Sequence, residues 1–174
     1  MFHKLAILFL IVTAVLIVIH YLLRGRKSAA PGPRVGLLAT IIYLFFLISL
    51  LGLALTSFIP AVAAHRLAGS LLMLHCVFGP PFAIFFALFI LFFAAAPGPG
   101  FQKILFWSSA ILGVIAIAST LLSMTPLFGQ AGQVILFETH RYTSVLLFCF
   151  IVLYAYLRRL PLRYASIPPV VANM

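Results

Sequence analysis

Two histidines, each followed directly by an arginine, are the residues of this chain whose type and spacing best suit chemistry. The first opens the run 65–69, His-Arg-Leu-Ala-Gly, and the second opens the run 140–144, His-Arg-Tyr-Thr-Ser. Both fit the pattern His-Arg-x-[Ala/Thr]-[Gly/Ser]. In a helix, the residues three and four positions along lie on the same face as the starting residue. Small residues therefore clear a flat space beside each imidazole.

A flat space between two imidazoles suits a porphyrin held edge-on between two helices, and helical bundles build cofactor sites from side chains on facing helices. We expect one haem b, with the two histidines as iron ligands and the two arginines paired with its propionates. The expected cofactor-binding residues are His65, His140, Arg66, Arg141, Gly69 and Ser144. A magnesium chlorin, which needs one histidine per pigment, is an alternative. Close helix packing without a cofactor is another.

Two further histidines fall inside apolar stretches, where ionisable residues are rare and usually functional. His75 comes ten residues after His65, about 15 Å farther along a helix, and the corresponding position after His140 is Phe150. We expect His75 to be a hydrogen-bonded buried histidine beside a haem or quinone. The alternative is a second haem held by His75 and His20.

Glu138 is the only acidic residue of the chain and stands two residues before His140. It could satisfy the dipole at a helix N-terminus. Alternatively, it pairs with Arg66 or Arg141, or accepts a proton when a quinol is oxidised nearby.

Membrane-spanning helices must position these residues, because the composition excludes a soluble fold. Apolar residues make up 66% of the chain, charged residues 7%, and the mean hydropathy is +1.30. Soluble domains carry about 25% charged residues. Five apolar runs can each cross about 30 Å of hydrocarbon: 5–22, 37–59, 66–93, 104–122 and 139–157. We predict an all-α polytopic membrane protein with five transmembrane helices.

The distribution of lysine and arginine predicts the orientation. The cations that follow the first, third and fifth spans are Arg24, Arg26, Lys27, Arg34, Lys103, Arg158, Arg159 and Arg163. Loops rich in such residues stay cytoplasmic, so we expect a periplasmic N-terminus and a cytoplasmic C-terminus in the cell inner membrane. Because the cations cluster between apolar runs, the net charge of +10 does not indicate a nucleic-acid partner.

Three regions follow from this pattern. We expect an N-terminal transmembrane anchor with a cytoplasmic loop (1–36), a four-helix haem-binding bundle of two repeated hairpins (37–160) and a cytoplasmic tail (161–174). Gly79–Pro80–Pro81 should kink or locally unwind the third span.

The run 65–69, with His75 in the same span, resembles the His-Arg-x-x-Gly…His helices of membrane b-type cytochromes. These include cytochrome b subunits of hydrogenases and formate dehydrogenases, and ferric-reductase-like transmembrane domains. The resemblance extends over spans two to five. It implies a helical bundle with one or two b haems that moves electrons between a peripheral redox partner and membrane quinone. Diheme members space their two histidines more widely and repeat the pair, whereas here the gap is ten residues and the second helix has only His140.

The expected function is therefore an electron-transfer subunit of a respiratory or photosynthetic oxidoreductase complex, rather than a stand-alone enzyme with catalytic side chains. Its partners would be other subunits of that complex, the lipid bilayer and a quinone. The alternative is a cofactor-free structural or assembly subunit of a membrane complex.

Overall fold

The computed structural model describes residues 2–24, 36–62, 69–95, 97–98 and 100–159. These residues form helices without any strand, which confirms the all-α prediction for this part of the chain. The helices are α1 (Phe2–Arg24), α2 (Leu37–Val62), α3 (Gly69–Phe93), α4 (Phe101–Ser123) and α5 (Gln130–Arg159).

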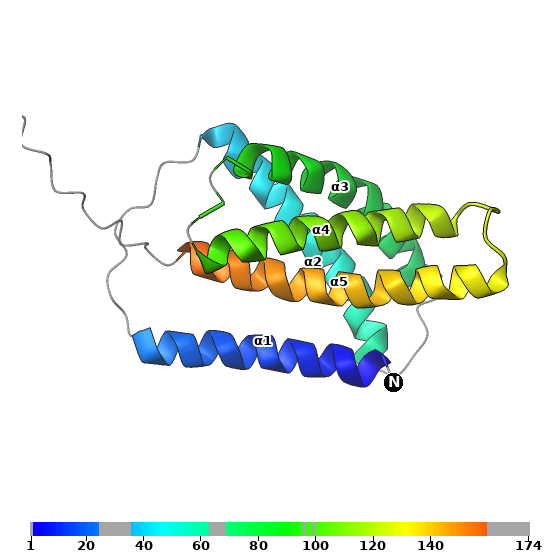
Figure 1. Ribbon diagram of the computed structural model, residues 1–174, viewed down its shortest axis with the longest axis horizontal. Helices are drawn as coiled ribbons and strands as arrows, with labels where there is room; N and C mark the ends of the chain where they lie inside the picture. The colour runs from blue at the N-terminus through cyan, green and yellow to red at the C-terminus, as the bar shows by residue number, and fades with distance from the viewer. Residues whose placement is uncertain (1, 25–35, 63–68, 96, 99, 160–174) are drawn as a thin grey trace, which may run out of the picture.

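The helices lie side by side as two antiparallel pairs and one additional helix (Figure 1). Helix α2 packs along α3, helix α4 packs along α5, and α1 lies mainly against α5. We call the end where α2 and α4 finish and α3 and α5 begin the histidine end. The opposite end, where α3 and α5 finish and α4 begins, is the basic end.

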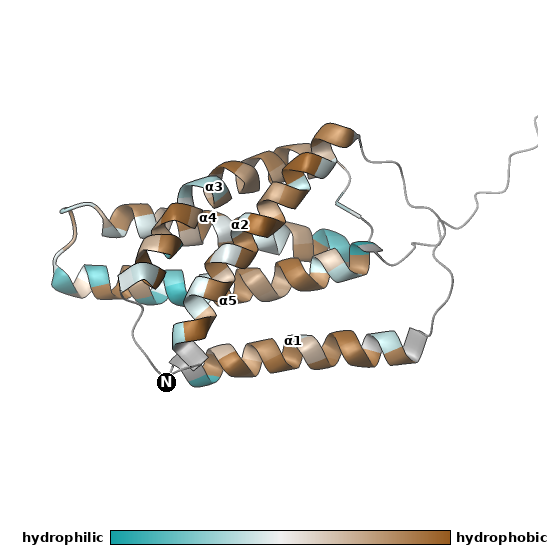
Figure 2. Ribbon diagram, turned by 180° about the vertical axis from the view of Figure 1, so that it is seen from behind, coloured by the Kyte–Doolittle hydropathy of each residue, from teal (hydrophilic) through white to brown (hydrophobic). Residues whose placement is uncertain are grey.

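Helices α2 to α5 are each long and apolar enough to cross a membrane. The apolar stretch described in α1, Lys4–Ile19, is shorter than these four. Apolar residues cover most of the helix surfaces, whereas polar residues gather toward the two ends of α5 (Figure 2). The structure therefore supports an integral membrane protein, and the fifth span stays a prediction.

Helix α5 begins well before the predicted span. It starts at Gln130, where the expected apolar run started at 139, and Gln133 N donates to Gly129 O at 3.0 Å in its first turn. Hydropathy places the start of a span at its apolar part, whereas a helix can continue into a polar stretch. As a result, His140 lies ten residues inside α5 and not at its beginning.

Helix α3 is continuous from Gly69 to Phe93, and Pro80 and Pro81 lie inside it. The expected local unwinding at this point is therefore wrong, and the kink stays a prediction.

An aromatic core joins the two helix pairs toward the basic end. Phe86 and Phe89 of α3 are buried, and Phe89 stacks on Phe46 of α2 with ring centroids 4.6 Å apart. The ring of Tyr154, from α5, meets Phe89 at 6.1 Å and is 1% exposed. Gly113 of α4 admits Phe86, because a Cβ at that position would lie 2.1 Å from the ring's Cζ. This core fixes the two pairs relative to each other.

Candidate functional site: a facing histidine pair

His75 of α3 and His140 of α5 face each other where the two helix pairs meet. Their ring centroids are 6.4 Å apart and their planes cross at 87°. Both side chains are half-buried. His75 is six residues from the start of α3, about 9 Å from that helix end. We call these two residues the histidine pair.

Hydroxyl groups of α2 hold the ring of His75. Its Nδ1 lies 3.0 Å from Thr56 Oγ1 and 3.2 Å from Ser57 Oγ. The Thr56 hydroxyl has one hydrogen, and two backbone carbonyls of its own helix lie within reach of it, Gly52 O at 2.9 Å and Leu53 O at 3.0 Å. The Thr56 oxygen is therefore available as an acceptor, and we infer that Nδ1 of His75 carries the proton.

His140 is held in the same way by α4. Its Nδ1 lies 2.7 Å from Thr120 Oγ1 and 3.0 Å from Ala116 O. A carbonyl oxygen can only accept, and the Thr120 hydroxyl already donates to Ala116 O at 3.0 Å. The proton of His140 is therefore on Nδ1 as well.

The two hairpins thus hold their histidines with the same arrangement of hydrogen bonds. In each hairpin, a threonine hydroxyl near the end of the first helix donates to a backbone carbonyl of its own helix and accepts a hydrogen bond from a histidine of the second helix. The histidine follows the threonine by 19 residues in one hairpin and by 20 in the other. The sequence shows this signal as Thr56 with His75 and Thr120 with His140. The His-Arg repeat at 65–69 and 140–144 matches a different pair of positions, so it did not reveal the equivalence.

The shared tautomer leaves both Nε2 atoms with a lone pair. All hydrogen bonds from the described residues to the two rings go to Nδ1. A first-row metal ion lies about 2 Å from an imidazole nitrogen, so two imidazoles on opposite sides of one ion have centroids about 6 Å apart. The observed separation of 6.4 Å leaves room for one metal ion between the two rings.

A carbonyl or hydroxyl acceptor on the other ring nitrogen is the usual outer shell of a metal-binding histidine, because it fixes the tautomer and raises the basicity of the ligand. The histidine pair has this shell on both sides. The described residues contain no cluster of three or more His, Cys, Asp or Glu side chains that could hold a metal ion. Two histidines could hold a metal that takes its remaining ligands from elsewhere, as haem iron does from its porphyrin.

Arg141 lies one turn from Glu138 and forms an ion pair with it through Nη1 and Oε1. Both side chains are partly exposed, at 45% and 41%. The pairing of Glu138 with Arg141 is thus confirmed, whereas its place at the first turn of a helix is wrong, because α5 begins eight residues earlier.

The remaining predicted residues are placed as follows. His65 and Arg66 lie outside the described residues, and with them the pairing of His65 with His140. Gly69 is the first residue of α3, with φ +57°, and no atom lies within 4 Å of where its Cβ would be. Ser144 is half-buried, one turn after His140. His20 lies in the last turns of α1, at the basic end, so the structure does not bring it to His75.

Comparison of this chain with known protein families, with curated proteins and with solved structures gave no match in any of the three.

Proposed function

We propose that this protein is a membrane electron-transfer subunit that binds one haem b between His75 and His140. The observation that carries the proposal is the histidine pair itself: two imidazoles from different helix pairs with ring centroids 6.4 Å apart, each with Nδ1 bonded to an acceptor and Nε2 left for a ligand. Relative to the pairing expected from the sequence, His140 is kept as a ligand and His75 takes the place of His65.

Neighbouring residues of this chain orient the two histidine rings and change the basicity of their nitrogens. Thr56 and Thr120 fix the rotation of the two rings. The contact from His140 to Ala116 O strengthens this imidazole as a donor to iron. Bound haem supplies reversible one-electron chemistry at the iron, and axial ligands, hydrogen bonds and burial set its potential.

Arg141 and Arg66 are the proposed partners of the haem propionates. Arg141 follows His140 directly in the sequence and pairs with Glu138, and guanidinium groups bind carboxylates through paired hydrogen bonds. Ser144, one turn after His140, would leave room beside the porphyrin. Gly69 lies six residues before His75 and would serve this purpose only with His65 as the ligand.

The cation distribution favours a cytoplasmic basic end, so the histidine end would lie on the outer side of the cell inner membrane. Electrons would pass at that side between a partner redox subunit and a quinone. With one haem as its proposed redox group, the protein would need a partner subunit that donates or accepts the electrons.

Haem content of histidine variants tests the assignment. We expect purified protein to show the reduced α-band of a b haem, and His75→Ala and His140→Ala each to remove it. His65→Ala and His20→Ala serve as matched controls and should retain it. Loss of the band in His65→Ala with retention in His75→Ala would restore the pairing of His65 with His140. A folded, colourless wild-type protein would instead indicate the structural or assembly role.

A further inference from the structure

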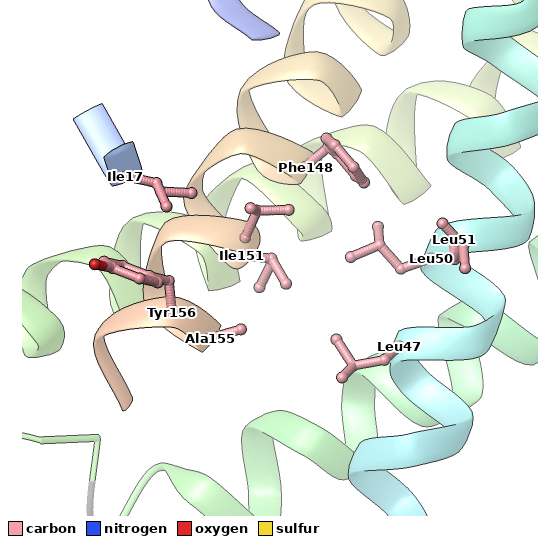
Figure 3. A pocket seen from close by; sticks show the side chains of 9 residues that line it. Ile17, Leu47, Leu50, Leu51, Phe148, Ile151, Ala155 and Tyr156 are labelled. Carbon is pink, nitrogen blue, oxygen red and sulfur yellow. The ribbon is translucent and has the colours of Figure 1, made fainter. Parts of the chain in front are cut away.

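An apolar groove of about 420 Å³ lies between α1, α2 and α5. Leu47, Leu50 and Leu51 line it from α2, and Phe148, Ile151 and Ala155 line it from α5 (Figure 3). Ile17 of α1 contributes to the third side. The groove is separate from the histidine pair, and nothing in the proposed haem site uses it.

The groove reaches from near the basic end to about the middle of a bilayer. Its α5 residues lie between three and eleven positions before the end of that helix, about 5 to 17 Å along the helix axis. Its α2 residues lie 10 to 14 positions after the start of α2, about 15 to 21 Å along that axis. Half of a hydrocarbon core is about 15 Å. An extended hydrocarbon chain that entered from the basic end would therefore lie along the groove.

The two ends of the groove differ in polarity. Toward the histidine end, Phe148 meets Phe58 of α2 edge-on, with ring centroids 5.3 Å apart. Toward the basic end, the groove finishes at Tyr156, whose hydroxyl oxygen points away from the aliphatic side chains (Figure 3). A ligand with one polar head would accordingly place that head at the basic end.

The positive charge at the basic end favours a ligand with an anionic headgroup. In the sequence, eight of the eleven lysine and arginine residues adjoin the helix ends on this side, and the only acidic residue, Glu138, belongs to the histidine end. Among the described residues, Arg24 and Arg159 are the last residues of α1 and α5, two of the three helices that line the groove. The Arg158 guanidinium is directed to the aromatic core, over Phe93 and bonded to Tyr154. Basic clusters next to membrane spans attract anionic lipid headgroups.

We propose that the groove binds one acyl chain of an anionic phospholipid from the cytoplasmic leaflet, with its phosphate at the basic end. The bound chain would fill the space between α1 and the α2–α5 face, where α1 packs mainly on α5 alone. This proposal is independent of the haem, because the groove lies away from the histidine pair.

The test is native mass spectrometry of the full chain purified in mild detergent and supplied with phosphatidylglycerol or phosphatidylcholine of identical acyl chains. We expect one retained phosphatidylglycerol per protein, preferred over phosphatidylcholine, with a preference that weakens at high salt. Ala155→Phe should fill the groove and reduce retention by about tenfold. Ala87→Phe, the same change on an exposed face of α3 near the same end, should leave retention unchanged.

Equal retention of the two lipids would overturn the anionic selectivity, and equal loss in both variants would overturn the groove as the binding site. If the wild-type protein instead retained one isoprenoid quinone per chain, and Ala155→Phe abolished that retention, the occupant of the groove would be a quinone and not a phospholipid. Haem content should be the same in Ala155→Phe and wild type, so a failure of this proposal is distinguishable from a failure of the haem assignment.

Discussion

At the scale of single residues, the site depends on two hydroxyl groups as much as on two imidazoles. Thr56 and Thr120 each use their hydrogen on a backbone carbonyl and offer their oxygen to a histidine. The acceptor role is what fixes the proton on Nδ1.

Thr120→Val tests this role, because valine has a similar shape and no hydroxyl. Outer-shell changes of this kind cost about 10–100-fold in metal affinity, and we expect haem affinity to fall within that range while the protein stays folded. Titration of apoprotein with haemin measures the change. Thr40→Val is the control, since Thr40 makes the same bond to the carbonyl four residues back, Gly36 O, on an exposed part of α2. Equal affinities for Thr120→Val and wild type would exclude the hydroxyl as a positioning group.

The ion pair between Arg141 and Glu138 should matter little for folding. Both groups are partly exposed, and exposed ion pairs contribute about 0–1 kcal/mol. For Glu138→Gln we therefore expect a free energy of unfolding within about 1 kcal/mol of wild type, measured by denaturant titration in detergent. A larger loss would mean that Glu138 has a buried partner in the intact protein.

At the scale of helices, the contact between Phe86 of α3 and Gly113 of α4 holds the two hairpins in register. A Cβ at position 113 would lie 2.1 Å from the Phe86 ring, and overpacking a core costs about 1–3 kcal/mol. We expect Gly113→Ala to lower the free energy of unfolding by this amount and to weaken haem binding, because the histidine pair spans the same two hairpins.

Thermal unfolding in detergent checks the prediction. Gly36→Ala is the control, since no atom lies within 4 Å of a Cβ there. Phe86→Leu combined with Gly113→Ala should recover part of the loss. Unchanged stability of Gly113→Ala alone would show that the hairpins do not depend on this contact.

The sequence predicted the helices better than it predicted the partner of His140. Apolar runs long enough to span a bilayer identify helices with little ambiguity, so the segments 37–59 and 104–122 agree closely with α2 and α4. The polar first part of α5 does not carry that signal, and hydropathy missed it. The pairing of His75 with His140 depends on how α3 is placed against α5, and that placement comes from the aromatic core and not from any local motif.

At the scale of the whole molecule, the topology depends on α1. Its described apolar stretch is shorter than those of the other four helices, yet it lies alongside the second half of α5, with Ala6 packed on Val145 and Cys149, and continues toward the basic end (Figure 1). If α1 spans the membrane, the number of spans is odd and the two termini lie on opposite sides.

Reporter fusions at each terminus test this topology. We expect a fluorescent protein that folds only in the cytoplasm to be active at the C-terminus and inactive at the N-terminus, because the basic end stays inside. Activity at both termini would contradict a spanning α1 and leave four spans.

The most direct test of the central claim is the haem content of the purified wild-type chain, measured as pyridine haemochrome per protein. A single site between His75 and His140 predicts a ratio of about one b haem per chain. A folded protein that contains no haem, even after supply of the cofactor during expression, would contradict the proposed function.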